Sequence, residues 1–404
     1  MNQMGPGPYI LTVNGGSSSV KFALYETSLA SSPVVRGKIE RIGIPESVMH
    51  VTKGSGGRLD HWSVEVPDHR TGAIRLLDWL EAHTGLGNIR AIGHRVVHGG
   101  AKYVRPEMVT ADLLEELRRI SPYVPEHLPA EINLIESFRD RCPTVPQVAC
   151  FDTSFHRDMP CVARLLAIPR RYEKLGLQRY GFHGLSCSFL MKELARIGNK
   201  DEAAGRVVLA HLGNGASLTA VKDGKSVETT MGFTPTSGMP MSCRSGDIDP
   251  GLVSYLARVE GMNAEQFHTM INTESGLLGV SERSSDMRDL LAHEECDSRA
   301  ADAVALFCYQ ARKWIGALAA VMGGLDTLVF SAGIGENSPI VRARICEGLE
   351  FLGLIIDPQR NEAGGSVISK ENSRVTVRVI PTDEEREIAR SVLEMLATGR
   401  DDEE

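Results

Sequence analysis

The sequence predicts an α/β protein built from two similar domains that flank a nucleotide cleft, and three Gly-rich segments support this prediction. Residues 9–24 run an apolar strand into a turn of Asn, Gly and Ser residues and out into a second strand. Residues 207–222 repeat the pattern, and Ser217 aligns with Ser19. In residues 328–337 a strand meets a Gly-rich turn and then a helical pattern. Either hairpin alone is typical of an ordinary tight turn, but together the segments favour an internal duplication.

Composition and length exclude several classes of protein. The 404 residues are 42% apolar, which is enough for two sizeable cores. A net charge of −8, without a basic block, argues against a nucleic-acid partner. The eight cysteines form no Cys-x-x-Cys pair, so we expect neither a zinc site nor disulfides. No window approaches 18 apolar residues and no signal-peptide pattern is present, so we expect a soluble cytoplasmic protein without a membrane partner.

The first half of the chain reads as strands followed by helices. Strand-like runs alternate with turns over residues 9–66, and residues 52–57 are expected to form a hairpin tip. Apolar residues at helical spacing predict three helices, over residues 73–83, 111–120 and 129–138. Buried strands are predicted over residues 89–98 and 147–151, which close a first domain of residues 1–151.

The second half repeats this scheme in a domain of residues 152–382. A hairpin over residues 207–229 precedes a long loop over residues 232–249, rich in Gly, Pro, Ser and Thr. Helices are predicted over about 250–272 and 300–322, followed by the strand and Gly-rich turn of residues 325–337 and a strand over 375–380. Thr382 or Asp383 can cap a terminal helix over residues 383–404.

The first hairpin turn has the chemistry of an anion-binding site. Gly15 and Gly16 allow backbone N–H groups to approach a phosphate, while the serines at 17–19 supply hydroxyl donors and Lys21 a positive charge. A Walker-type loop would open a helix, whereas the residues after Lys21 read as a strand. The turn therefore predicts phosphate binding without a Walker motif.

A few charged residues stand in Gly- and Ser-rich settings. Arg95 and Arg244 could each fork onto a carboxylate or phosphate, although for one arginine alone a strand-end ion pair is the commoner explanation. His183 lies between glycine-containing turns, where a lone histidine is more often structural. Candidates for binding Mg²⁺ and its waters are Asp152, Asp247, Asp249 and Glu384, while an aspartate in a turn is usually a cap, as Asp247 and Asp249 are if they only start the next helix.

The chain resembles the acetate kinases over nearly its whole length, through nine motifs that follow one another in the family's order. Each is weak alone, and the ordered set is specific. The motifs are Asn14–Lys21, Gly93–Gly100, Phe151–His156, Tyr180–Gly184, His211–Ser217, Met231–Pro235, Arg244–Pro250, Ala332–Asn337 and Ile380–Glu385.

This resemblance implies two duplicated actin-like (ribonuclease H-like) domains of the sugar kinase, actin and heat-shock ATPase superfamily. It implies a homodimer that reversibly transfers a phosphoryl group from ATP to acetate, giving acetyl phosphate and ADP. The terminal helix would return to the first domain, which would serve the acyl and phosphate side, while the second domain would bind nucleotide. The implied cofactor is Mg²⁺, with Mn²⁺ as an alternative.

The resemblance also implies roles for individual residues. Arg95, Asp152, His183 and Arg244 would be catalytic, and Asn14 and Glu384 would bind the metal. The acid would contact Arg95, Val97, His127, Phe182 and Pro235. Nucleotide would be bound by Ser17, Ser19, Lys21, His211, Gly213, Asn214, Gly215, Asp286, Met287, Arg288, Gly333, Ile334, Gly335, Glu336 and Asn337.

Four departures from the family pattern lie near the expected acyl pocket. They are Glu126 before His127, the run Leu185–Cys187, Thr236–Ser237 and Ser242–Cys243. They leave phosphoryl transfer intact and leave the acyl chain length open, so a propionate or butyrate kinase is the first alternative. A pyrophosphate-linked acetate kinase and a non-catalytic ATP-binding switch are the others, and an arginine pair facing the acid argues against the switch.

Overall fold

The computed structural model describes residues 7–16, 18–28, 32–54 and 59–401. Its contacts divide the chain into two compact units. Unit 1 comprises Met1–Ser154 and Asp383–Glu404, and unit 2 comprises Phe155–Thr382.

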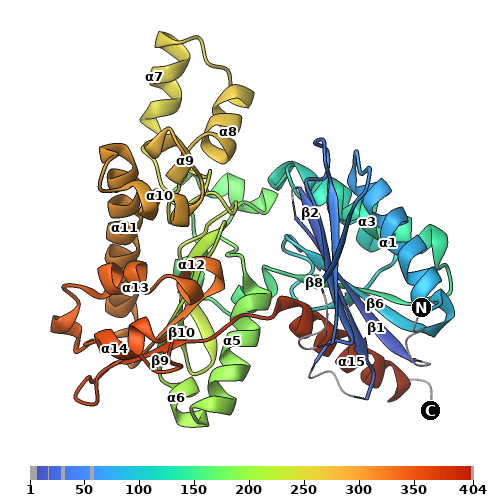
Figure 1. The fold of residues 1–404 in the computed structure, drawn as a ribbon. Coiled ribbons are helices and arrows are strands. Elements are labelled where there is room, and N and C mark those ends of the chain that lie inside the picture. The colour runs from blue at the N-terminus through green and yellow to red at the C-terminus, as the bar shows by residue number, and fades with distance from the viewer. Residues whose placement is uncertain (1–6, 17, 29–31, 55–58, 402–404) are drawn as a thin grey trace. The chain divides into compact units, whose positions relative to one another are not determined.

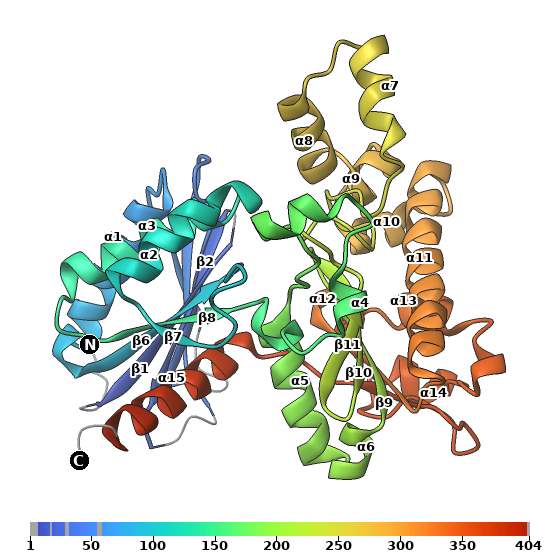
Figure 2. The ribbon, with the colours of Figure 1, turned by 180° about the vertical axis from the view of Figure 1, so that it is seen from behind.

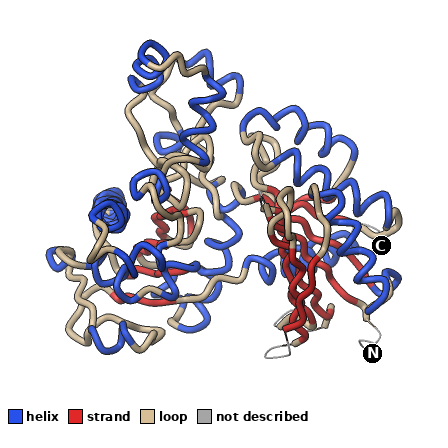
Figure 3. The backbone as a smooth tube through the Cα atoms, turned by 45° about the horizontal axis from the view of Figure 1, so that its top comes forward, coloured by secondary structure: helices blue, strands red, loops and turns tan. Residues whose placement is uncertain are grey.

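Unit 1 is built on one eight-stranded sheet whose strands are drawn in red in Figure 3. Its order is β5-β4-β3-β2-β1-β6-β8-β7. The strands are β1 (Tyr9–Gly15), β2 (Ser19–Glu26), β3 (Val35–Glu40), β4 (Val48–Lys53), β5 (Leu59–Ser63), β6 (Ile89–Val96), β7 (Glu107–Met108) and β8 (Gln147–Phe151). The predicted hairpin at 52–57 exists, because Thr52 pairs with Leu59, although residues 55–58 lie outside the described part of the chain.

Helices cover both faces of this sheet (Figures 1 and 2). They are α1 (His69–His83), α2 (Ala111–Ile120), α3 (Leu128–Arg141) and α15 (Glu384–Asp401). On β1, Leu11 and Val13 join a core with Leu134 and Phe138 of α3. Residues of a strand point alternately to the two faces, and α15 packs on β1, β6 and β8 from the opposite side. Helix α15 thus covers the face of the sheet opposite α3.

Unit 2 is built on a five-stranded sheet of order β11-β10-β9-β12-β13. Its strands are β9 (Arg206–Leu212), β10 (Ala216–Lys222), β11 (Lys225–Thr229), β12 (Thr327–Ser331) and β13 (Thr376–Val379). Its helices are α4 (Cys161–Arg164), α5 (Gly184–Ile197), α6 (Lys200–Ala204), α7 (Gly251–Val259), α8 (Ala264–Thr273), α9 (Gly276–Ser281), α10 (Met287–His293), α11 (Ser298–Met322), α12 (Ala332–Asn337), α13 (Pro339–Cys346) and α14 (Pro358–Glu362).

Five strands of the unit 1 sheet have the same order and directions as the five strands of the unit 2 sheet, which confirms the predicted duplication of the fold. In unit 1, β3, β2 and β1 are joined by antiparallel pairing and β1, β6 and β8 by parallel pairing. In unit 2, β11, β10 and β9 are antiparallel and β9, β12 and β13 are parallel. The Gly-rich hairpin turn occupies the same position in each sheet, between the first two strands in chain order.

One range that is predicted as a single helix holds two helices in the structure. The helical spacing predicts a single helix over about 250–272, whereas the structure has α7 and α8 in this range. The break falls at Gly261, whose φ of 68° lies in the left-handed region, and Asn263 then caps α8. The expected cap of the terminal helix is confirmed for Asp383, whose Oδ1 accepts a hydrogen bond from the Arg386 N–H at 3.0 Å.

Candidate active site

The first hairpin turn is closed by its own backbone. The Gly16 N–H donates to the Ser19 carbonyl at 2.7 Å, and Asn14 on β1 lies opposite Lys21 on β2. Lys21 is exposed, so its ammonium group is available to an anion. The strand that follows confirms that the turn does not open a helix. Ser17, which is predicted to bind nucleotide, lies outside the described residues.

Arg95, near the end of β6, is held by Asp152 and by the first hairpin. Its Nε and Nη2 donate to Asp152 Oδ2 at 3.0 and 2.6 Å, and its Nη1 donates to the Gly15 carbonyl at 3.2 Å. The ion pair expected of a strand-end arginine is therefore present. It also orients the guanidinium, because two donors that converge on one carboxylate oxygen fix the plane of the group.

The charge of Arg95 persists despite its burial. Burial lowers the pKa of Arg95, but the charges of Asp152 and Glu384 raise it above the ordinary arginine value. The side chain of Asp152 is fully buried and that of Arg95 is 13% exposed. A buried cation that keeps its charge and an exposed edge is suited to bind an anionic ligand.

The two predicted metal residues, Asn14 on β1 and Glu384 at the start of α15, contact each other. Asn14 Nδ2 donates to Glu384 Oε2 at 2.9 Å and to Glu385 Oε1 at 3.3 Å. Burial and the neighbouring Glu384 raise the pKa of Glu385, whereas the charge of Lys21 lowers it. The remaining amide and carboxylate oxygens are ligands of the kind that Mg²⁺ prefers. Among the described residues, no three His, Cys, Asp or Glu side chains are grouped to hold a metal ion.

Val97 and His127 flank a carboxyl group that sequence reasoning missed. The Val97 N–H, just after β6, donates to Oε2 of Glu131 at 2.9 Å. His127 is the N-cap residue of α3, and Glu131 follows one turn later. A glutamate on a helix is usually exposed, so nothing in the local sequence marks this one.

In unit 2, His183 is held in a conformation that few residues adopt. It is the N-cap of α5 with φ of 59°, in the left-handed region that costs free energy for a residue with a Cβ. Its Nδ1 lies 2.9 Å from Ser217 Oγ, and its ring stacks on His211 at 4.2 Å. His211 Nδ1 in turn lies 2.8 Å from Ser186 Oγ. The second hairpin therefore orients His183.

Arg244 reaches the same hairpin from the long loop. Its Nη1 donates to the Pro235 carbonyl at 2.6 Å. A Cβ built on Gly215 would lie 2.7 Å from Arg244 Nη2 and 3.0 Å from His183 Nε2. The tips of the two predicted catalytic side chains thus meet at the backbone of Gly215, where there is no room for a side chain.

Phe182 is positioned by a second histidine. The Phe182 carbonyl lies 2.9 Å from His156 Nε2, and His156 Nδ1 lies 2.9 Å from Ser226 Oγ. Burial lowers the pKa of His156 to about 4. His156 is therefore neutral at physiological pH and structural, while it holds the backbone beside His183.

Gly215→Ala is expected to lower kcat by about 100-fold with little loss of stability. The new methyl group would displace only the ends of two flexible side chains, and a shift of about 1 Å at a reacting group can cost this much in rate. The control is Gly316→Ala on α11, where an added Cβ would meet no atom within 4 Å. Steady-state rates and melting curves of both variants check this; equal kcat values would contradict it.

The predicted nucleotide turn at residues 332–337 is α12. Glu336 Oε1 accepts hydrogen bonds from the N–H groups of Ala332 and Thr382, at 2.7 and 3.0 Å. The fully buried Arg342 donates to the carbonyls of Gly335 and Glu336, both at 2.9 Å. Arg342 is a second residue that sequence reasoning missed, because its burial results from tertiary contacts.

Part of the predicted nucleotide set is brought together. A Cβ on Gly213 would lie 3.9 Å from the Gly333 N atom, so the second hairpin adjoins α12. Asp286 is the N-cap of α10 and pairs with Arg288 at 2.6 Å. No hydrogen bond among the described residues joins Asp286 or Arg288 to Gly333–Asn337.

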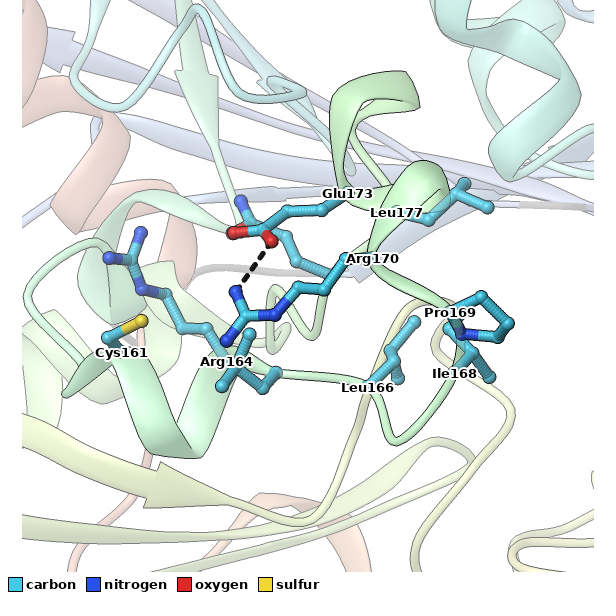
Figure 4. Close-up of a pocket in the computed structure, with 10 residues that line it drawn as sticks. Cys161, Arg164, Leu166, Ile168, Pro169, Arg170, Glu173 and Leu177 are labelled. Carbon is cyan, nitrogen blue, oxygen red and sulfur yellow. Dashed lines mark hydrogen bonds and ion pairs between the residues drawn. The ribbon is translucent and has the colours of Figure 1, made fainter.

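A cavity of about 170 Å³ in unit 2 contains none of the predicted site residues (Figure 4). Cys161, Arg164, Arg170 and Glu173 are among its lining residues, and Arg170 pairs with Glu173 at 2.7 Å. Both side chains of this pair are exposed, as is typical of a surface ion pair, so the pair gives the cavity no buried cation that would bind an anion.

Comparison with known proteins gives consistent results over nearly the whole chain. The model of the acetokinase family matches residues 9–390. An acetate kinase of Methylocella silvestris is 43% identical over 400 residues, with 96% of this chain and 98% of that protein covered. An acetate kinase of Bacillus subtilis is 42% identical over 393 residues, covering 96% and 99%.

Solved structures agree with the sequence relatives. A Porphyromonas gingivalis acetate kinase has a TM-score of 0.86 and 35% identity, covering 96% of this chain and 100% of that one. A propionate kinase of Francisella tularensis has a TM-score of 0.88 and 37% identity, covering 95% and 98%. In the described residues, no helix is long and apolar enough to cross a membrane.

Proposed function

The chain belongs to the acetokinase family, and we propose that it transfers a phosphoryl group reversibly from ATP to acetate, giving acetyl phosphate and ADP. The observation that carries this proposal is the meeting of Arg244 and His183 at the second hairpin turn. Two donors aimed at one Gly-rich turn are suited to stabilise the charge of a transferring phosphoryl group.

The acid attacks the phosphoryl group directly and in line. A carboxylate with an ordinary pKa is ionised at neutral pH, so it needs no general base. We propose that Arg95 and Arg244 bind the acid and the phosphoryl group, and that His183 donates to the phosphoryl oxygens in the transition state. Asp152 orients Arg95, and Val97, His127, Phe182 and Pro235 bind the acid. Catalysis then consists of alignment and charge stabilisation.

The nucleotide-binding part of the proposal uses the two hairpins and α12. Ser17, Ser19 and Lys21 would bind phosphate oxygens from the first hairpin, and His211, Gly213, Asn214 and Gly215 from the second. The adenosine would lie against Asp286–Arg288 and Gly333–Asn337. The Arg342 bonds to the carbonyls of Gly335 and Glu336 support this assignment, because they hold the turn in one conformation.

Asn14 and Glu384 have the donor set for a divalent cation, Mg²⁺ or in its place Mn²⁺. Such a cation would neutralise phosphate charge when bound. The contact between Asn14 and Glu384 supports this assignment, because it places the amide oxygen of Asn14 near a carboxylate.

Glu384→Ala is expected to raise the Mg²⁺ concentration that gives half-maximal activity by about tenfold or more, because one oxygen ligand is lost. If Glu384 only starts α15, the variant would melt at a lower temperature with an unchanged Mg²⁺ requirement. Glu394→Ala, an exposed position on the same helix, is the control. The measurement is a Mg²⁺ titration of the rate at saturating ATP.

One assay tests the reaction itself. ADP formation is measured with acetate, propionate or butyrate, and hydroxylamine traps the acyl phosphate. Acetyl hydroxamate formed in step with ADP is the expected result. Absence of hydroxamate with every acid would overturn the proposed function.

A propionate kinase is the second candidate, favoured by the Francisella tularensis structure. The half-buried Glu126 beside His127 is the departure that bears most directly on acid size. The ratio of kcat/KM for propionate and acetate decides between the two. Replacing ATP with pyrophosphate in the same assay tests the pyrophosphate-linked alternative.

The proposal includes a homodimer in the cytoplasm. Helix α7 exposes apolar side chains that a second copy could cover, namely Leu252, Val253, Tyr255 and Val259. The eight free cysteines are consistent with a reducing compartment. Light scattering measures the mass of the protein in solution and so tests whether it is a dimer.

A further inference from the structure

The carboxyl group of Glu131, on α3, is buried and only half satisfied. Glu131 is 3% exposed. Its Oε2 accepts the Val97 N–H, whereas its Oε1 has no hydrogen-bond partner in the described part of the chain. Leaving a buried polar atom without a partner costs free energy, so such an atom in a folded protein is often explained by a ligand.

The surroundings of Glu131 are those proposed to bind the acid. A Cβ on Gly15 would lie 3.8 Å from Glu131 Cγ, and the Gly15 carbonyl accepts a hydrogen bond from Arg95. The His127 carbonyl accepts the Glu131 N–H at 3.1 Å. Glu131 therefore adjoins Arg95, Val97 and His127, the three residues of unit 1 that are proposed to bind the acid.

Glu131 is not needed as a counter-ion for Arg95. Asp152 already accepts two hydrogen bonds from that guanidinium. Burial raises the pKa of Glu131 to about 8; Arg95 and the Val97 N–H oppose the rise, and Asp152 adds to it. At neutral pH the carboxyl group therefore keeps its proton. One oxygen accepts from Val97, and the other is an O–H donor.

We propose that Glu131 is a substrate-binding residue, whose free oxygen donates a hydrogen bond to the carboxylate of the acid that Arg95 also binds. The inference rests on the proposed function and adds a neutral donor to its charged groups. A protonated carboxyl group beside a carboxylate forms a short, charge-assisted hydrogen bond. An ionised Glu131 would instead repel the acid.

The KM for acetate, measured from pH 6.5 to 9.5 with saturating ATP and Mg²⁺, tests this role. The wild-type KM is expected to be constant below about pH 8 and to rise toward tenfold per pH unit above it. Glu131→Gln keeps an acceptor for Val97 and an N–H donor for the acid but does not titrate. Its KM at pH 7 is expected to stay within a few-fold of the wild-type value and to remain flat to pH 9.5.

Two further variants separate binding from structure. Glu131→Ala removes the donor and is expected to raise the KM for acetate at every pH, with the KM for ATP unchanged. Glu136→Gln, at a surface ion pair on the same helix, is the matched control and should follow the wild type. A pH-dependent KM in Glu131→Gln that matches the wild type would overturn the inference. So would an unchanged KM in Glu131→Ala.

Thermal stability tests the protonation state without reference to the reaction. A carboxyl group whose pKa is higher in the folded state than in the unfolded state destabilises the fold once the unfolded group ionises. The melting temperature of Glu131→Gln should therefore exceed that of the wild type by a margin that grows from pH 5 to pH 8. A constant margin would show that Glu131 is ionised and would overturn the inference. A wild type that is inactive with every acid would instead overturn the proposed function.

Discussion

Replacing Arg95 or Arg244 with lysine is expected to lower kcat by about 10²–10³-fold, although both variants keep the positive charge. In the structure Arg95 uses three nitrogens at once, toward Asp152 and the Gly15 carbonyl. A lysine ammonium cannot reproduce two parallel hydrogen bonds, so it would be held less rigidly. The loss should appear in kcat more than in the KM for ATP, because the fork is required where charge develops.

The controls for these variants are arginines of the same elements or segments. Arg90 is exposed on β6, and Arg258 is exposed on α7, which follows the Arg244 loop. Arg90→Lys and Arg258→Lys are expected to retain wild-type kinetics. Near-normal turnover in both Arg95→Lys and Arg244→Lys would rule out the proposed roles of the two guanidinium groups.

Arg342→Met is expected to destabilise unit 2 by about 3 kcal/mol or more and to raise the KM for ATP. The Arg342 side chain is 1% exposed and donates to four acceptors. They are the backbone carbonyls of Gly335, Glu336 and Asn361 and the side-chain Oδ1 of Asn361. Methionine fills most of the volume but leaves these acceptors unpaired. The nucleotide turn would lose its support.

Urea denaturation and ATP-dependent kinetics check both parts of this expectation. Arg344→Met, on the same helix, removes a partly exposed pair with Glu294 at 2.6 Å and should cost at most about 1 kcal/mol. If the two variants lose equal stability, the buried hydrogen bonds of Arg342 stabilise unit 2 no more than a partly exposed ion pair does.

Local patterns were sufficient to predict most of the elements. Helix α2 and strand β8 have the predicted bounds, because the spacing of apolar residues and the Thr110 cap are properties of adjacent residues. The helix predicted over about 250–272 was wrong in one respect, since Gly261 interrupts it. The period of apolar residues continues across this turn, and it therefore conceals the break.

Candidate site residues were predictable where they stand in unusual local settings. Arg95, His183 and Arg244 each lie close to Gly residues, and it is their occurrence together in such settings that pointed to a site. Glu131 and Arg342 lie on ordinary helices, and their burial depends on Val97 and Asn361, which are far away in sequence. No local pattern records such a pairing, so they were found only in the structure.

Unit 1 is made of two segments that are far apart in the sequence, so we expect the two units to fold at different times during synthesis. Unit 2 is one continuous segment, so a growing polypeptide can complete it as soon as residue 382 has left the ribosome. The sheet of unit 1 emerges first but lacks Ile388, Ala389 and Val392, which are fully buried on α15. The domain made first is therefore expected to fold last, with one apolar face of its sheet open until α15 has left the ribosome. Nascent chains released before α15 should depend on chaperones or aggregate.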